Sequence, residues 1–176
     1  MGAERFYMKE NLPQRKRIRL LEYDYSTEGY YFITICTKNR IEILGKIKDI
    51  CRGGNLPSAK IKLTDIGIIV EKYIKQITNV YDNVNIDEYI IMPNHIHMIL
   101  ILENSNEHNI SKIIGQFKRN VSMELKYSIW QKLFYEHVIR NDKEYYMIKE
   151  YIRTNIIKWK EDRYSGRLIA APTKIN

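Results

Sequence analysis

The segment YIIMPNHIHMILIL, residues 89–102, constrains the fold of this chain more than any other. Two apolar runs flank Pro93 and Asn94, a pair typical of a tight turn, so the wider stretch 85–102 predicts two strands joined at that turn. Alternate side chains of a strand lie on one face, so His95 and His97 should point the same way. The sequence therefore predicts a buried strand that presents two imidazoles on one side.

The hydrophobic periodicity of the other segments predicts an α+β domain. Further strands are predicted at 30–40 and 133–140, helices at 65–81, 109–126 and 142–162, and a β-hairpin on either side of the turn sequence CRGGNLPS. This order of elements predicts a ferredoxin-like βαββαβ antiparallel sheet with helices on one face, an inserted β-hairpin and a C-terminal helix.

Composition and charge indicate how the chain is divided and which class of partner it binds. The arm at 1–25 is basic, the folded domain is expected at 26–163, and a tail at 164–176. A net charge of +8 favours a polyanionic partner, most often nucleic acid. No apolar run reaches the roughly 18 residues that span a bilayer, and Cys36 and Cys51 lack metal-finger spacing. We therefore expect a cytoplasmic, nucleoid-associated protein without a membrane partner.

The spacing of His95 and His97 allows two interpretations. Two imidazoles on one strand face can ligate one divalent cation, and an amide or carboxylate oxygen would complete a site for Mg²⁺ or Mn²⁺. The alternative is a pair of core histidines that hydrogen-bond within the fold.

The predicted C-terminal helix carries two polar side chains that could join the histidines in a site. Tyr151 and Asn155 are four residues apart and therefore share a helix face. A tyrosine hydroxyl can attack phosphorus when a cation neutralises the phosphate and lowers the effective pKa of the phenol, ordinarily about 10. The alternative for Tyr151 is packing, because the chain has 14 tyrosines.

Three stretches resemble a known family. PNHIHMIL, at 93–100, resembles the His-hydrophobic-His (HUH) motif of single-tyrosine transposases. The segment at 130–159, WQKLFYEHVIRNDKEYYMIKEYIRTNIIKW, resembles the C-terminal signature of REP-associated tyrosine transposases, and 17–40 resembles the N-terminal stretch of that subgroup. Together they extend over residues 17–163, most of the chain.

The resemblance implies roles for particular residues. His95 and His97 would be catalytic metal ligands, Tyr151 the nucleophile, and Asn155 the third ligand. The chain departs from the family at Ile156, where a proline is usual, so we expect the helix to continue beyond Asn155. The implied activity is cleavage and rejoining of single-stranded DNA next to hairpin repeats, through a 5′-phosphotyrosine intermediate.

The implied partner is single-stranded or hairpin DNA, bound by a monomer or a homodimer. Basic side chains expected to contact it lie on the arm and the second helix, and His137 belongs to the signature; the set is Arg15, Lys16, Arg17, Arg19, Lys118, Arg119 and His137. Lys118 and Arg119 could equally form the solvated face of a helix, and His137 could serve a structural hydrogen bond. Two alternative functions are a catalytically silent hairpin-binding protein, such as a repressor, and an RNA-processing protein.

Overall fold

The computed structural model describes residues 26–51, 58–103 and 109–165 of the chain. Its main sheet is antiparallel, with the strand order β4-β5-β1-β6. The four strands are β1 (Gly29–Cys36), β4 (Val84–Met92), β5 (His95–Leu102) and β6 (Tyr135–Ile139). The predicted hairpin forms a separate two-stranded sheet of β2 (Gly45–Cys51) and β3 (Ser58–Leu63), after a short 3₁₀ turn, η1 (Lys38–Arg40).

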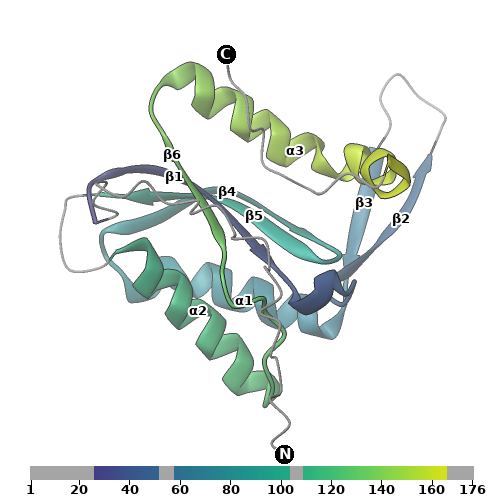
Figure 1. The fold of residues 1–176 in the computed structure, drawn as a ribbon, viewed down its shortest axis with the longest axis horizontal. Coiled ribbons are helices and arrows are strands. Elements are labelled where there is room, and N and C mark those ends of the chain that lie inside the picture. The colour runs from purple at the N-terminus through teal and green to yellow at the C-terminus, as the bar shows by residue number, and fades with distance from the viewer. Residues whose placement is uncertain (1–25, 52–57, 104–108, 166–176) are drawn as a thin grey trace, which may run out of the picture.

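Three helices cover the main sheet on its two faces (Figure 1). They are α1 (Asp65–Val80), α2 (Ile110–Leu125) and α3 (Asp142–Ser165). Helices α1 and α2 lie side by side on one face, and α3 crosses the other. The predicted α+β class, antiparallel sheet, inserted hairpin and C-terminal helix are thus confirmed.

Two predicted boundaries differ from the structure. The first strand ends at Cys36 because the chain then turns into η1. Helix α3 continues past Ile156 to Ser165, beyond the predicted end at Asp162, and so includes the start of the predicted tail. The arm at 1–25 lies outside the described residues.

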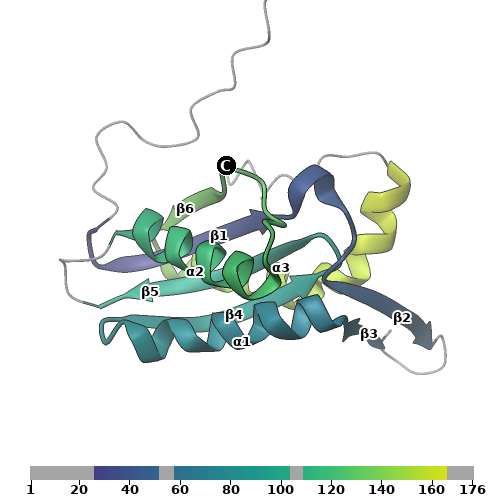
Figure 2. The same cartoon turned by 90° about the horizontal axis from the view of Figure 1, so that it is seen from below.

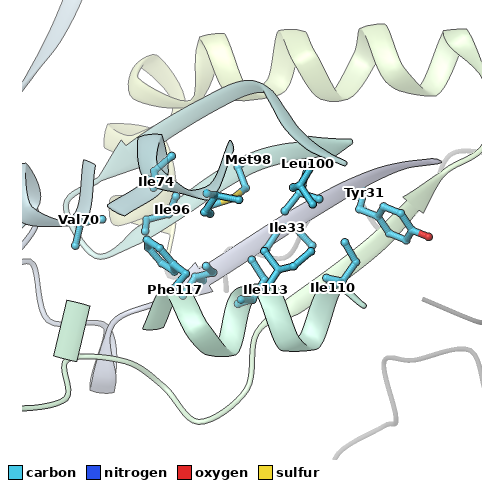
Figure 3. Close-up of a cluster of buried hydrophobic side chains, with 14 of the residues drawn as sticks. Tyr31, Ile33, Val70, Ile74, Ile96, Met98, Leu100, Ile110, Ile113 and Phe117 are labelled. Carbon is cyan, nitrogen blue, oxygen red and sulfur yellow. The ribbon is translucent and has the colours of Figure 1, made fainter. Parts of the chain in front are cut away.

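The main hydrophobic core lies between the sheet and α1 and α2 (Figure 3). Inward side chains of β1 and β5, such as Ile33 and Met98, meet Ile74 of α1 and Ile113 of α2, and all four are fully buried. Burial of each such side chain contributes roughly 1.5–3 kcal/mol, so this layer provides much of the stability.

Side-chain caps fix where the three helices begin. Thr64 accepts a hydrogen bond from the backbone N–H of Gly67, and Asn109 does the same for Lys112. Asn141 accepts from the backbone N–H of Glu144 at 2.9 Å at the start of α3. Such caps satisfy amides that have no partner inside the helix.

A β-bulge in the edge strand β4 changes which side chains face α3. The register between β4 and β5 shifts between Ile86 and Glu88, so Asp87 is an extra residue. Neighbouring residues of a regular strand point to opposite faces, but here both Asp87 and Glu88 reach side chains of α3. The bulge therefore supplies two adjacent carboxylates to the same helix.

In the part of the chain that the structure describes, no helix combines the length and the apolar character needed to cross a membrane.

Candidate active site

The two histidines lie at the start of β5, in the interior of the main sheet. His95 pairs in register with Cys36 of β1 and Met92 of β4, and His97 pairs with Thr34 of β1. The rings of His95 and His97 face α3, with centroids 4.4 Å apart and exposures of 1% and 0%. The predicted common orientation of the two imidazoles is confirmed.

Asn94 fixes the protonation of His95. Its Nδ2 group donates to the backbone carbonyl of Arg40 at 3.2 Å, so its Oδ1 atom faces His95 Nδ1 at 2.8 Å. An amide oxygen can only accept, so the proton of neutral His95 lies on Nδ1. The Nε2 atom then carries a lone pair, and it is buried without a hydrogen-bond partner among the described residues.

His97 is held between β1 and α3. Its Nδ1 atom is 2.8 Å from the Thr34 hydroxyl, and its Nε2 atom is 3.4 Å from the Tyr151 hydroxyl. Phe32 stacks on the His97 ring at a centroid distance of 5.2 Å and meets the Tyr151 ring edge-on at 6.1 Å. The phenol of Tyr151 is therefore positioned against the second histidine.

Asn155 lies beside the first histidine, one helical turn after Tyr151. It is 3% exposed, and it favours the protonated form of His95, although its geometry relative to Nε2 falls short of a hydrogen bond. Trp159, another turn along α3, covers the His95 ring at a centroid distance of 5.7 Å. The structure thus brings together the four side chains His95, His97, Tyr151 and Asn155.

Burial keeps both imidazoles neutral. Desolvation lowers the pKa of His95 to about 3, aided by the positive charge of Arg40 and opposed by Asn155. Desolvation also lowers the pKa of His97 well below its ordinary value, with a further contribution from His95. A neutral imidazole is the form that ligates a metal.

The donor atoms suit a divalent cation held by neutral ligands. Within the described ranges, His95 Nε2 has no hydrogen-bond partner, and His97 Nε2 makes the long contact with Tyr151. Among the described residues there is no cluster of three or more His, Cys, Asp or Glu side chains that could hold a metal. The donors therefore fit a cation only as two imidazoles with an amide oxygen, and an anionic ligand would come from the substrate.

Polar contacts hold α3 against the edge of the sheet. The Lys149 ammonium lies 3.0 Å from each carboxylate oxygen of Asp87, which also accepts from the Tyr145 hydroxyl at 2.8 Å. Arg153 contacts Glu88 at 2.9 Å. These contacts flank Tyr151 in sequence, so the bulge in β4 helps to set the position of the phenol.

The residues predicted to contact DNA are dispersed. Lys118 lies on α2, across the sheet from Tyr151, and donates to the backbone carbonyls of Gln131 at 2.6 Å and Lys132 at 3.2 Å. Burial lowers the pKa of Lys118. Arg119 is exposed on the same helix.

His137 makes a local contact at the start of α3. Its Nε2 atom lies 2.6 Å from a carboxylate oxygen of Glu144. The other carboxylate oxygen accepts from the backbone N–H of Arg140 at 2.8 Å, one residue before the position expected for a capping box. Arg15, Lys16, Arg17 and Arg19 lie outside the described residues, so all contacts of these residues with DNA remain predictions.

Sequence reasoning assigned no role in the site to Asn94, Thr34 or Arg40. Asn94 was expected only to form a turn, yet it orients His95. The sequence feature that could have indicated this role is the position of Asn94 directly before His95, because polar side chains commonly orient a ligating imidazole. Thr34 became identifiable only through its register with His97.

Comparison with known proteins places the chain among relatives. No family model matches the chain. An uncharacterised protein of Haemophilus influenzae is 32% identical over 174 residues, which cover 85% of this chain and 92% of that protein. A second Haemophilus influenzae protein, provisionally named a REP-associated tyrosine transposase, is 29% identical over 82 residues, 39% of this chain and 47% of that protein.

One solved structure extends the comparison to the fold. A REP-associated tyrosine transposase bound to a REP hairpin has a TM-score of 0.59 and 19% identity, and the match covers 90% of this chain and 93% of that one. The resemblance noted in the sequence is therefore found in the fold as well. The chain belongs to one family with the first Haemophilus influenzae protein, and its fold is that of a REP-associated tyrosine transposase.

Proposed function

We propose that the chain is a metal-dependent single-strand DNA transposase that cleaves and rejoins DNA next to hairpin repeats. The observation that carries this proposal is the 3.4 Å approach of the Tyr151 hydroxyl to His97 Nε2, in a site that also contains His95 and Asn155. A nucleophile from one element thus meets candidate metal ligands from another.

His95, His97 and Asn155 would hold Mg²⁺ or Mn²⁺. When bound, such an ion would neutralise charge on the scissile phosphate and would stabilise the charge that develops as the phosphodiester bond breaks. The chain prepares these ligands by keeping both imidazoles neutral and by placing the His95 proton on Nδ1.

Tyr151 performs the covalent step. Its phenolic oxygen attacks phosphorus as the phenolic proton leaves, a bond from oxygen to phosphorus forms, and the bond from phosphorus to the 3′ oxygen breaks. The departing 3′ oxygen gains a proton and becomes a hydroxyl, and the 5′ phosphate stays on Tyr151. Attack by another 3′-hydroxyl reverses this exchange and joins new ends without an external energy source.

The DNA partner of this chain is inferred from the structural neighbour and from charge. That neighbour is bound to a REP hairpin, and this chain carries a net charge of +8. We therefore propose a folded single strand as the substrate, with cleavage close to the hairpin and a monomer or homodimer as the active form.

A denaturing gel tests this function. A labelled hairpin oligonucleotide with single-stranded flanks and Mn²⁺ should give a protein–DNA adduct that survives detergent and heat. Tyr151→Phe should give no adduct, whereas Tyr146→Phe, at an exposed position of the same helix, should react like the unaltered protein.

Two results would contradict the proposal. An adduct with Tyr151→Phe would show that another group is the nucleophile. Hairpin binding without cleavage, whichever divalent cation is supplied, would identify a catalytically silent hairpin-binding protein instead.

A further inference from the structure

The β2–β3 hairpin carries an unusual face of four lysines, which we call the lysine ribbon: Lys46, Lys48, Lys60 and Lys62. Lys46 pairs in register with Lys62, and Lys48 with Lys60. All four side chains are exposed, whereas the isoleucines between them are half-buried on the other face. Like charges directly opposite one another destabilise a strand pair, and lysine is depleted in strands.

The positive charge of the lysine ribbon is not neutralised within the described part of the chain. No ion pair or hydrogen bond connects any of the four ammonium groups to a described side chain. Exposed lysines of α1 differ, because Lys72 and Lys75 pair with Glu124 and Glu71. The Cβ atoms of these lysines should lie roughly 7 Å apart along each strand and about 5 Å apart across the pair. Four cations grouped in this way, without a partner among the described side chains, complement a polyanion.

The base of the hairpin is joined directly to the site. The backbone N–H of Leu44 donates to the carbonyl of Pro93 at 3.0 Å, and the backbone N–H of Thr64 donates to the carbonyl of Leu44 at 3.1 Å. Pro93 belongs to the turn that leads into His95. The hairpin extends from there beyond the end of the main sheet, beside the last turns of α3 (Figures 1 and 2).

We propose that the lysine ribbon is a docking surface for the phosphate backbone of a DNA strand that continues from the active site. This inference rests on the proposed function, and it assigns to that function a surface that contacts phosphates without reading bases. The register that places lysine opposite lysine is thereby explained, because bound phosphates remove the repulsion between the cations.

Binding measured against salt concentration tests the lysine ribbon. The probe is a hairpin oligonucleotide with single-stranded flanks, and every protein carries Tyr151→Phe so that binding is separated from cleavage. Replacing all four ribbon lysines by glutamine should weaken binding roughly tenfold to a few hundredfold near 0.1 M salt. The slope of log K against log salt should fall by about 0.7 for each phosphate that the variant no longer neutralises.

Two further variants control for net charge and for folding. The control variant replaces four other lysines by glutamine and so removes the same charge from the α1–α2 layer. These are Lys72, Lys75, Lys112 and Lys126, and their replacement should change DNA binding less than threefold. Arginine at the four ribbon positions keeps the charge and should retain binding. Because the ribbon side chains are exposed and glutamine removes their mutual repulsion, neither ribbon variant should unfold at a lower temperature than the Tyr151→Phe parent.

The outcomes separate the ribbon from the proposed function. Suppose that the Tyr151→Phe parent binds the DNA hairpin. If the variant with glutamine at the four ribbon positions binds it equally well, or if the α1–α2 control variant loses as much affinity, the ribbon inference is overturned while the proposed function stands. If the parent does not bind DNA, both fail. If the glutamine variant of the ribbon aggregates but binds DNA as before, the role of the four lysines is to prevent edge-to-edge strand pairing between molecules. Ribbon-dependent binding to phosphatidylserine vesicles but not to DNA would show that the assigned partner is wrong.

Discussion

The two faces of the main sheet are built by the same strands, yet they differ in what their side chains do. On the α1–α2 face, β5 contributes Ile96, Met98 and Leu100 to a large apolar core. On the α3 face the same strand contributes His95 and His97, and the apolar cluster there contains five buried residues among those the structure describes. The α3 face is completed by hydrogen bonds and ion pairs with β4.

This difference separates stability from chemistry within a single sheet. Burial of apolar surface against α1 and α2 holds the strands in register, so the α3 face can accommodate buried imidazoles that cost stability. The attachment of α3 is smaller and more polar, and this helix carries the phenol and the carboxamide of the proposed site. The apolar half of the fold therefore positions the half that carries the proposed site.

Matched cavity mutations on the two faces should give the largest effects on stability. Ile113→Ala in α2 should lower the free energy of unfolding by about 3–4 kcal/mol. Ile152→Ala in α3 should cost nearer 2 kcal/mol, because its smaller cluster is bordered by half-buried side chains that can close the cavity. Urea unfolding monitored by circular dichroism would measure both, and a larger loss for Ile152→Ala would reverse the comparison.

Mild acid should destabilise the protein through the α3 face. The pKa values of His95 and His97 are lowered in the folded state, so the unfolded state binds more protons once the pH falls below about 6.5. Full stability is therefore present above that pH and is lost towards the folded-state pKa, at about 1.4 kcal/mol per pH unit for each histidine.

Urea unfolding with a metal chelator, at pH 7 and 5.5, would measure this loss as about 3 kcal/mol. His97→Gln should roughly halve it. Glu144 does not interfere: burial raises the pKa of its carboxyl, but hydrogen bonds from Arg140 and His137 outweigh that effect and lower it, so its contribution is lost only below about pH 4.5. A pH-independent stability over this window would contradict the assignment of two buried neutral imidazoles.

The sequence predicted much of this arrangement, and the limits of that prediction have physical causes. Strand alternation placed both imidazoles on one face, and helix periodicity placed Tyr151 and Asn155 together; these are local rules that the fold obeys. The role of Asn94 depends on a carbonyl at Arg40, 54 residues away in sequence, which no local pattern encodes. The lysine ribbon depends on the register of a hairpin whose turn length leaves several pairings open.

Replacing Asn94 would test how the proposed metal ligand His95 is oriented. Asn94→Ala removes the acceptor for His95 Nδ1 and should weaken Mn²⁺ binding about 10- to 100-fold. Asn94→Asp keeps an acceptor for His95 Nδ1 but loses the donor to the Arg40 carbonyl, so its affinity should lie between those of the parent and Asn94→Ala. Electron paramagnetic resonance of free Mn²⁺, with Tyr151→Phe protein and hairpin DNA, would measure this, and equal affinity for Asn94→Ala would show that the amide has only a structural role.

The smallest expected effect concerns the polar attachment of α3. Asp87→Asn weakens the contacts with Lys149 and Tyr145 and should lower the global stability by about 1 kcal/mol or less, because these groups are partly exposed. Hydrogen exchange should nevertheless increase in α3 and remain unchanged in α1. Equal changes in both helices would show that the two faces are not energetically separate.

The extra residue in β4 makes the orientation of α3 an independently adjustable property. The bulge lies in an edge strand, ahead of the turn that leads to the histidines, and its two carboxylates contact side chains of α3. Changing the charge of Asp87 and Glu88, or deleting one of them, should change the orientation of α3 and of the Tyr151 phenol. The pairing of β5, β1 and β6 should remain. Divergent relatives could in this way change the reach of the proposed nucleophile, and an engineer could do the same, while both imidazoles stay buried.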